Sequence, residues 1–322
     1  MPDPADTYAL GLDLGGTKIF AGLVDRAGNV RQSWRIPTPV DEGGPAILRA
    51  LVEAVGTIRS NLSERERDRL VGVGVSSAGH INHRTGVVEY CTPNLPGWRG
   101  IRITEAIESA HRLPACADND GNCAAYGEHW MGAGRGFQHL VALTLGTGLG
   151  GGIIADGRVV RGARGSGGEI GHAILVPDGL LCQCGQQGCA EVYVSGTALA
   201  RASERSGLWT PAPTTHQLFE WARAGDGQAM GLIERMAHHL ATVLVTIINV
   251  LDPERIVLGG GVSEQGDLFL PTVRRELARQ YGERGWDPGQ LVLAQLGEHA
   301  SMIGAAGEAF ERFGTPAAVA VR

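Results

Sequence analysis

The sequence lacks several features that would point to nucleic acids, membranes or secretion. Its 322 residues carry 28 Lys and Arg against 34 Asp and Glu, so no basic excess favours nucleic acid or an anionic membrane as a partner. The first residues, MPDPADTYAL, have neither the basic start nor the apolar run of a secretory signal peptide. The most apolar run, residues 241–251, is too short to span a bilayer. We therefore expect a cytoplasmic protein with no membrane or nucleic-acid partner.

Glycine, in contrast, is abundant, at 49 of 322 residues, or roughly twice its usual share. The glycines gather in four stretches: LGGTK, TLGTGLGGG, RGSGGEIGH and LGGGV. Clustered glycines at strand ends are typical of tight turns and of backbone that closes on a ligand. A glycine-rich linker is the alternative, but linker glycines would not alternate with apolar strands as these do.

Hydrophobic periodicity predicts an α/β protein in which strands lead into helices. We expect strands at residues 8–13, 18–25, 30–36, 70–76, 115–120, 139–145, 151–157 and 255–260. We expect helices at residues 45–60, 121–132, 195–205, 227–250 and from about 301.

A strand–glycine turn–strand pattern occurs twice, at residues 13–17 and 144–148, an offset of 144 − 13 = 131 residues. The repeat predicts two similar α/β halves, each presenting a glycine hairpin to a cleft between them. We expect a small domain at residues 1–121, completed by a C-terminal helix at about 301–322. The large domain then spans residues 122–300.

The first hairpin suits phosphate oxygens. Gly15 and Gly16 expose backbone N–H groups, Thr17 and Lys18 add a hydroxyl and a cation, and Asp13 could hold a hydrated Mg²⁺. An ordinary tight hairpin is the alternative, and the Walker A pattern GxxxxGK[ST] is absent. The second loop, GTGLGGG, favours enclosure of a polyphosphate from two sides, and the glycines at 259–261 could pass under a nucleotide base or ribose.

Carboxylates recur beside these loops. Asp120 stands where a strand becomes a helix, so it is either a helix N-cap or a base that accepts the proton of an alcohol, with Asn119 beside it. Glu169, His172 and Glu191 offer further acceptors, which suit the neighbouring hydroxyls of a sugar ring. Each of them alone could equally be a surface or capping residue.

Three cysteines lie close together at Cys182, Cys184 and Cys189, with His172 nine intervening residues upstream. This Cys3His set predicts a closed, structural Zn²⁺ site rather than a catalytic one, which would keep a ligand position open. A redox pair is disfavoured because C-x-x-C is missing, and a disulfide because the compartment is reducing. A metal-free thiol cluster is the alternative.

The motifs LGLDLGGTKI, NDGNCAAYGE, TLGTGLGGG, GSGGEIGH, CQCGQQGCAE and IVLGGGV, in this order, resemble the ROK family of sugar kinases and repressors. The resemblance runs from residue 9 to past residue 300 and implies an actin/hexokinase-like (ribonuclease H-like) two-domain fold with ATP-dependent phosphorylation of a hexose. It implies Asp120 as the general base. It also implies the following contacts: Asn94, Asn119, Glu169, His172 and Glu191 with the sugar; Gly15, Gly16, Thr17, Thr147 and Gly148 with the phosphates; Gly260 with the adenosine side; and zinc on His172 and the three cysteines.

Segment 92–98, TPNLPGW, resembles the glucokinase branch, whereas SSAGHIN at 76–82 and Gly121 depart from the commoner pattern. We expect glucose as the substrate, with N-acetylglucosamine, N-acetylmannosamine or fructose as alternatives. A repressor is disfavoured because no helix-turn-helix fits before the strand that starts at about residue 8. A sugar sensor without catalysis is a further alternative. We expect a homodimer or homotetramer.

Overall fold

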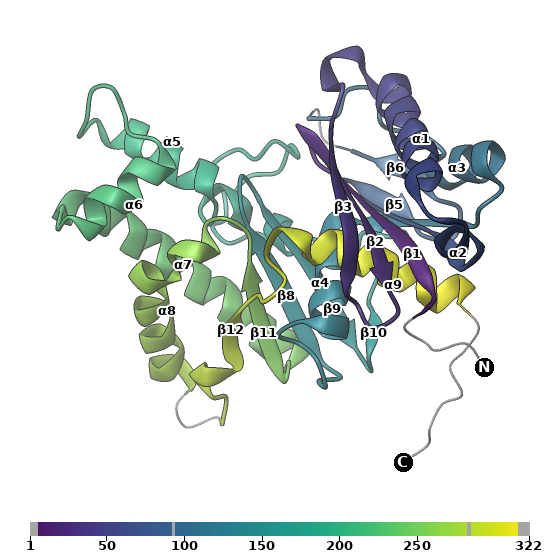
Figure 1. Cartoon of the computed structure of the whole chain (residues 1–322). Coiled ribbons are helices and arrows are strands. Elements are labelled where there is room, and N and C mark those ends of the chain that lie inside the picture. Colours follow the sequence, from purple (N-terminus) through teal and green to yellow (C-terminus); the bar gives the residue numbers. More distant parts are fainter. Residues whose placement is uncertain (1–5, 92–93, 282–284, 315–322) are drawn as a thin grey trace. The chain divides into compact units, whose positions relative to one another are not determined.

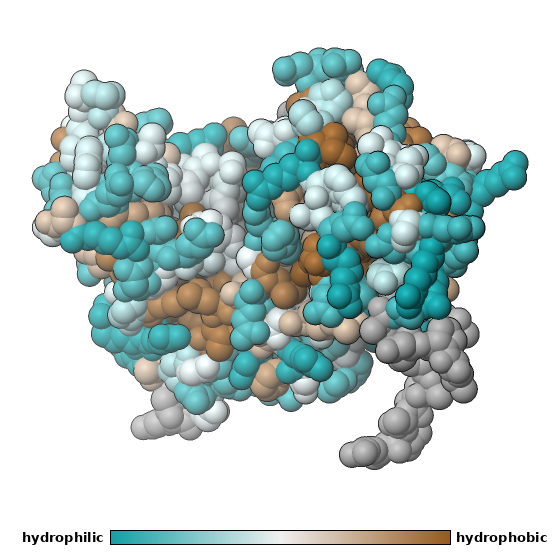
Figure 2. Space-filling model, viewed as in Figure 1, coloured by the Kyte–Doolittle hydropathy of each residue, from teal (hydrophilic) through white to brown (hydrophobic). Residues whose placement is uncertain are grey.

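The computed structural model describes residues 6–91, 94–281 and 285–314, and the chain divides into two compact units. Unit 1 comprises Met1–Arg135, Val159–Gly167 and Glu298–Arg322, and unit 2 comprises Gly136–Arg158 and Gly168–Gly297. Hydrophilic residues cover most of the face shown in Figure 2.

Unit 1 contains a five-stranded sheet in the order β3-β2-β1-β4-β7. Its strands are β1 (Tyr8–Leu14), β2 (Lys18–Asp25), β3 (Val30–Pro37), β4 (Leu70–Ser77) and β7 (Ala115–Asn119). The first three strands form an antiparallel meander, and β4 and β7 extend the sheet in parallel beside β1. The parallel strands carry Asp13, Ser76 and Asn119 to the same edge of the sheet, because β1, β4 and β7 all end there. A separate hairpin joins β5 (His80–Asn82) to β6 (Val87–Tyr90).

Helices cover both faces of this sheet. They are α1 (Gly44–Asn61), α2 (Glu64–Asp68), α3 (Ile103–His111), α4 (Asp120–Met131) and α9 (Ala300–Phe313). Residues from α1 and α3, such as Leu51 and Ile103, share a core with Leu10 and Leu12 of β1. Helix α9, drawn in yellow in Figure 1, packs on β1, β4 and α4.

Glycine lets α9 approach the sheet and α4 closely. A Cβ at Gly74 would lie 1.8 Å from the carbonyl oxygen of Ala305, and one at Gly11 would lie 2.1 Å from that of Met302. A Cβ at Gly304 would likewise meet the carbonyl oxygen of Cys123 at 1.8 Å. The glycines at these positions therefore fix the distance between α9 and the elements that carry Asp13 and Asp120.

Unit 2 repeats the same topology, with the strand order β10-β9-β8-β11-β12. The strands are β8 (Leu140–Leu145), β9 (Leu149–Ala155), β10 (Arg158–Val159), β11 (Arg255–Gly259) and β12 (Leu291–Leu293). Here too an antiparallel hairpin, β8–β9, is followed by parallel strands. The helices are α5 (Gly196–Ser206), α6 (Thr215–Arg223), α7 (Gly227–Leu251) and α8 (Gly266–Tyr281). The matching strand order confirms the predicted duplication.

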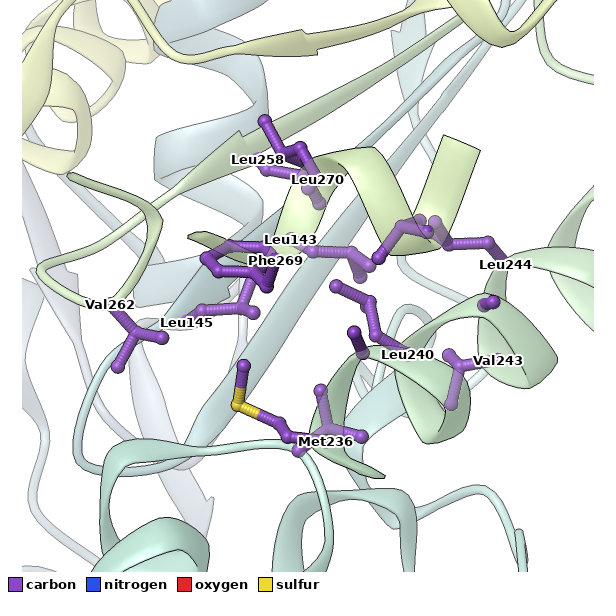
Figure 3. Close-up of a cluster of buried hydrophobic side chains, with 14 of the residues drawn as sticks. Leu143, Leu145, Met236, Leu240, Val243, Leu244, Leu258, Val262, Phe269 and Leu270 are labelled. Atoms are coloured by element: carbon purple, nitrogen blue, oxygen red, sulfur yellow. The ribbon is translucent and has the colours of Figure 1, made fainter. Parts of the chain in front are cut away.

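Side chains from β8, β11, α7 and α8 form the core of unit 2. Figure 3 shows Leu145 of β8, Leu258 of β11 and Phe269 of α8 gathered with residues of α7 such as Leu240 and Leu244. By length and composition alone helix α7 could cross a membrane, and 56% of its apolar stretch is buried within the protein. Its hydrophobicity is accounted for by this core, because the core helix of a globular domain can have the same length and composition.

Two differences from the sequence predictions concern boundaries. The predicted division after residue 121 falls inside α4, whereas the units meet at residues 135 and 136, because α4 packs on α9 within unit 1. The strand predicted at residues 151–157 is β9 (Leu149–Ala155) and starts two residues earlier, so the second glycine turn is only residues 146–148 long. The predicted C-terminal helix is α9, and residues 315–322 lie outside the described part of the chain.

Candidate active site

The first glycine hairpin joins β1 to β2 in unit 1. The N–H of Gly15 donates to the carbonyl oxygen of Lys18 at 3.0 Å, and the Thr38 hydroxyl donates to the carbonyl oxygen of Gly15 at 2.9 Å. Gly16 and Thr17 are exposed, and a Cβ at Gly16 would meet no atom within 4 Å. The tip therefore presents open backbone, as a phosphate-binding turn requires.

Lys18 is engaged by a residue far away in the sequence. Its Nζ lies 3.0 Å from Oε2 of Glu298, and the guanidinium of Arg35 lies 2.5 Å from Oε1 of the same carboxylate. Both pairs are exposed, so they contribute little to stability. Lys18 was predicted as a phosphate contact, and its ammonium group has further N–H donors besides the one directed to Glu298.

Asp13 lies at the end of β1, where Ser76 of β4 donates its hydroxyl to Oδ1 at 2.6 Å. Burial raises the pKa of Asp13 to about 6, the bond from Ser76 lowers it in part, and the charge of Asp120 raises it further. The pKa of Asp13 thus reports that the two carboxylates are electrostatic neighbours. A divalent cation would offset the cost of burying an ionised Asp13 and its repulsion by Asp120. The donor set therefore fits the predicted Mg²⁺.

Asp120 is the first residue of α4, and Asn119, not Asp120, is the N-cap. Oδ1 of Asn119 accepts from the N–H groups of Gly121 at 2.8 Å and Asn122 at 3.2 Å. Oδ1 of Asp120 also accepts from the N–H of Gly121 at 2.9 Å. The side chain of Asn119 does the capping, so the carboxylate of Asp120 is not needed for that role.

Asn94 lies in an exposed turn that follows β6. The segment is anchored by Trp98, which is fully buried and donates its indole N–H to the hydroxyl of Ser77 at 2.9 Å. Residues 92 and 93 of the predicted sugar loop lie outside the described part of the chain.

The second hairpin, in unit 2, joins β8 to β9 and contacts backbone from two other segments. The N–H of Gly196 donates to the carbonyl oxygen of Gly146 at 2.8 Å, while Thr147 at the tip is exposed. Gly260, with φ of +84°, packs on the same strand end, where a Cβ would lie 2.4 Å from the carbonyl oxygen of Leu145. Thr147, Gly148 and Gly260, which were predicted separately, therefore belong to one group.

Glu191 joins this hairpin to the cysteine cluster. Its Oε2 accepts from the N–H of Leu149 at 3.0 Å, and a Cβ at Gly148 would lie 2.3 Å from that oxygen. Its Oε1 lies 3.9 Å from Sγ of Cys182. The predicted sugar contact thus also has a structural role.

Four side chains could hold a metal ion. The ligand atoms of His172, Cys182, Cys184 and Cys189 all lie within 4.8 Å of one another. Sγ of Cys184 lies 3.6 Å from that of Cys189, and Nδ1 of His172 lies 3.8 Å from Sγ of Cys182. Tetrahedral ligands with bonds of about 2.3 Å stand about 3.8 Å apart, so the geometry fits Zn²⁺. No disulfide joins these cysteines in the described residues.

The other ring nitrogen of His172, Nε2, lies 3.9 Å from Oε2 of Glu169, in the turn η3 (Ile170–His172). Glu169, His172 and Glu191, three of the predicted sugar contacts, are thus linked through the cysteine cluster or its histidine. The other predicted site residues, apart from Asn94, lie at the two glycine hairpins or at the β7–α4 junction.

Sequence reasoning missed three residues of the site: Ser76, Asp118 and Glu298. Ser76 bonds to Asp13, Glu298 pairs with Lys18, and Asp118 supports the start of α4. Only Asp118 carried a usable signal, as a second carboxylate at the end of a buried strand, in ADND. The other two meet their partners through pairings distant in the sequence.

The duplicated sheet, with a carboxylate at the end of its first strand, defines a protein of the actin/hexokinase-like fold. The glucokinase structure from Streptomyces griseus in complex with glucose and AMPPNP superposes with a TM-score of 0.80, at 35% identity, over 94% of this chain and 99% of that one.

The chain belongs to the ROK family, whose model matches residues 9–310. A glucokinase of Streptomyces coelicolor is 36% identical over 313 residues, which cover 92% of this chain and 96% of the relative. An N-acetylmannosamine kinase of Shigella boydii is 32% identical over 92% of this chain and 96% of the relative.

Proposed function

We propose that the chain is a glucokinase, which transfers the γ-phosphoryl group of ATP to the 6-hydroxyl of glucose. The observation that carries the proposal is the β7–α4 junction, where Asp120 begins the helix and its charge raises the pKa of Asp13 at the end of β1. Membership of the ROK family and the likeness to glucokinases support the same reaction.

In this reaction the 6-oxygen forms a bond to the γ-phosphorus, the bond to the β,γ-bridging oxygen breaks, and ADP leaves. Asp120 accepts the hydroxyl proton as that bond forms, and positioning supplies most of the rate enhancement. Asp13 would hold a hydrated Mg²⁺, which neutralises phosphate charge when bound. Gly15, Gly16 and Thr17 in unit 1 and Thr147 and Gly148 in unit 2 would contact phosphate oxygens, and Gly260 the adenosine side.

The sugar hydroxyls would be contacted by the residues that the family resemblance indicates. Asn94 and Asn119 lie in unit 1, and Glu169, His172 and Glu191 lie in unit 2. Zn²⁺ on His172 and the three cysteines would hold the last three residues in place, so its role is structural. Because Nδ1 of His172 is directed to the cluster, Nε2 is the nitrogen that could reach a sugar hydroxyl.

N-acetylmannosamine, or another hexose, is the alternative substrate, because a kinase for that sugar shares 32% identity with this chain. Room around C2 of the sugar decides between these substrates. A sensor without catalysis is the other alternative, and the exposed hairpin tips and the presence of Asp120 at the start of α4 disfavour it.

The test is ATP-dependent release of ADP by the purified protein with glucose, mannose, fructose, N-acetylglucosamine and N-acetylmannosamine, with Asp120→Asn as the control. We expect the highest kcat/KM with glucose, and a loss of about 10²- to 10⁴-fold in Asp120→Asn with sugar binding retained. A maximum with another sugar would change the substrate and keep the mechanism. Near-normal turnover in Asp120→Asn would refute the assignment of the base.

A cytoplasmic location and a homodimer or homotetramer complete the proposal. An apolar groove of about 180 Å³ in unit 2 includes the exposed side chains of Ile174, Val250 and Leu251. Such a surface is typical of a face covered by a second copy of the chain. Light scattering on the purified protein measures the number of subunits.

A further inference from the structure

A buried ionic network lies behind the start of α4. It consists of Asp118 on β7, Arg161 on the segment that follows β10, and Glu308 on α9. The side chains of Asp118 and Glu308 are 0% and 6% exposed, and that of Arg161 is 20% exposed. Nη2 of Arg161 donates to Oε1 of Glu308 at 2.7 Å, and its Nε donates to Oδ2 of Asp118. One guanidinium thus joins carboxyl groups from two separate elements.

Asp118 in turn holds both ends of the turn that carries Asp120. Its Oδ1 accepts from the N–H of Asn119 at 2.7 Å and from the side-chain amide of Asn122 at 3.0 Å. Asp120 lies between these two attachment points, with its own Oδ1 on the N–H of Gly121. A rotation of the Asp118 carboxylate would therefore shift the backbone on either side of Asp120.

Burial raises the pKa of Glu308 well above its usual range, the charge of Asp118 raises it further, and Arg161 lowers it in part. Arg161 is thus the cation that offsets the cost of burying this carboxyl group.

We propose that Arg161 is a positioning residue, which fixes the carboxylate of Asp118 and through it the direction in which Asp120 faces the reacting hydroxyl. The proposal rests on the assignment of Asp120 as the base. A polar pocket of about 180 Å³ is lined by residues 162–165, which directly follow Arg161, and by Asn82, His83 and Arg84. The segment that carries Arg161 is therefore not packed tightly on all sides. The two bonds of Arg161 consequently supply the fixation that packing does not.

The test compares Arg161→Met and Arg161→Lys with Arg164→Met, an exposed arginine on the same segment, as the matched control. We expect kcat to fall on the order of 100-fold in Arg161→Met, with KM for ATP unchanged. Lysine cannot bond both acids in the fork geometry of arginine, so Arg161→Lys loses roughly 10-fold. Arg164→Met keeps native kcat.

Each rate is expressed per folded molecule, with the folded fraction taken from circular dichroism, and is measured again in the Asp120→Asn background. A positioning role predicts that replacement of Arg161 has no further effect once the base is gone. Equal losses in both backgrounds, or native kcat in Arg161→Lys, would overturn the proposal, and the lysine variant decides if Arg161→Met does not fold. Full turnover of Asp120→Asn alone would instead remove the base assignment, and the proposal with it.

Discussion

Replacement of Gly148 by alanine tests the contact between Glu191 and the second hairpin. The new Cβ would lie 2.3 Å from Oε2 of Glu191, an oxygen that accepts from the N–H of Leu149 at 3.0 Å. The carboxylate must therefore move, and the hydrogen bond breaks. Loss of a bond to a charged group costs about 1.5–3 kcal/mol, and the lower entropy of the unfolded alanine chain returns about 0.4–1 kcal/mol.

The net expectation is a loss of roughly 0.5–2.6 kcal/mol in the free energy of unfolding, or about 1–10 °C in Tm for a domain of this size. Gly16→Ala is the matched control, because it also changes a predicted phosphate-contacting glycine but its Cβ would meet no atom within 4 Å. We expect Gly16→Ala to leave Tm unchanged or slightly higher in the absence of ligand, and to raise KM for ATP.

Thermal unfolding without ligands, followed by steady-state kinetics with both substrates, measures these effects. We expect Gly148→Ala to raise KM for the sugar as well as for ATP, because displaced Glu191 is also a proposed sugar contact. A Gly148→Ala protein with native Tm and native KM for both substrates would refute the inference that Glu191 supports the hairpin.

Two further predictions concern the metal site and Asp13. Cys184→Ala should bind less zinc and lose turnover together, as measured by elemental analysis and kinetics, and native protein purified without zinc would contradict the metal assignment. Burial raises the pKa of Asp13 to about 6, so the folded protein holds this proton more tightly than the unfolded chain, and Asp13 lowers stability as the pH rises from about 4 to about 6. Asp13→Asn should therefore raise stability by about 1–3 kcal/mol at pH 7.5 in the absence of Mg²⁺, but little at pH 4.5, while turnover falls. Equal stabilisation at both pH values in thermal unfolding would contradict this reasoning.

The sequence predicted the hairpins and the central strands well because their signals are local. Alternating apolar residues and the glycines at strand ends placed β1, β2 and β4 within one residue of their observed bounds. Helices α2, α3, α6 and α8 went unassigned. Helix α8 contains Pro271, which opposes a helical assignment from sequence, and Phe269 and Leu277 stabilise the helix by packing in the core of unit 2.

In the candidate site, too, residues close together in the sequence were predictable and pairs far apart in the sequence were not. Asp120, the cysteines and the glycine turns were recognisable because the relevant residues are neighbours in the sequence. Lys18 and Glu298 are 280 residues apart, and Arg161 and Asp118 are 43 apart, so no local pattern reveals either pair. The sequence left Asp120 as either an N-cap or a base, because Asn119 and Asp120 are both good N-caps and only the backbone conformation shows that Asn119 is the cap.

The duplicated topology separates what the scaffold provides from what individual residues provide. Both units place a glycine hairpin beside parallel strands that end at one edge of the sheet. The residue equivalent to Asp13 in unit 2 is Thr144, 131 positions later, which carries no charge. Unit 2 instead supports its hairpin with Glu191 and the cysteine cluster. Because the same backbone occurs with and without the carboxylate, the roles proposed for Asp13 and Asp120 belong to unit 1 alone and do not follow from the fold.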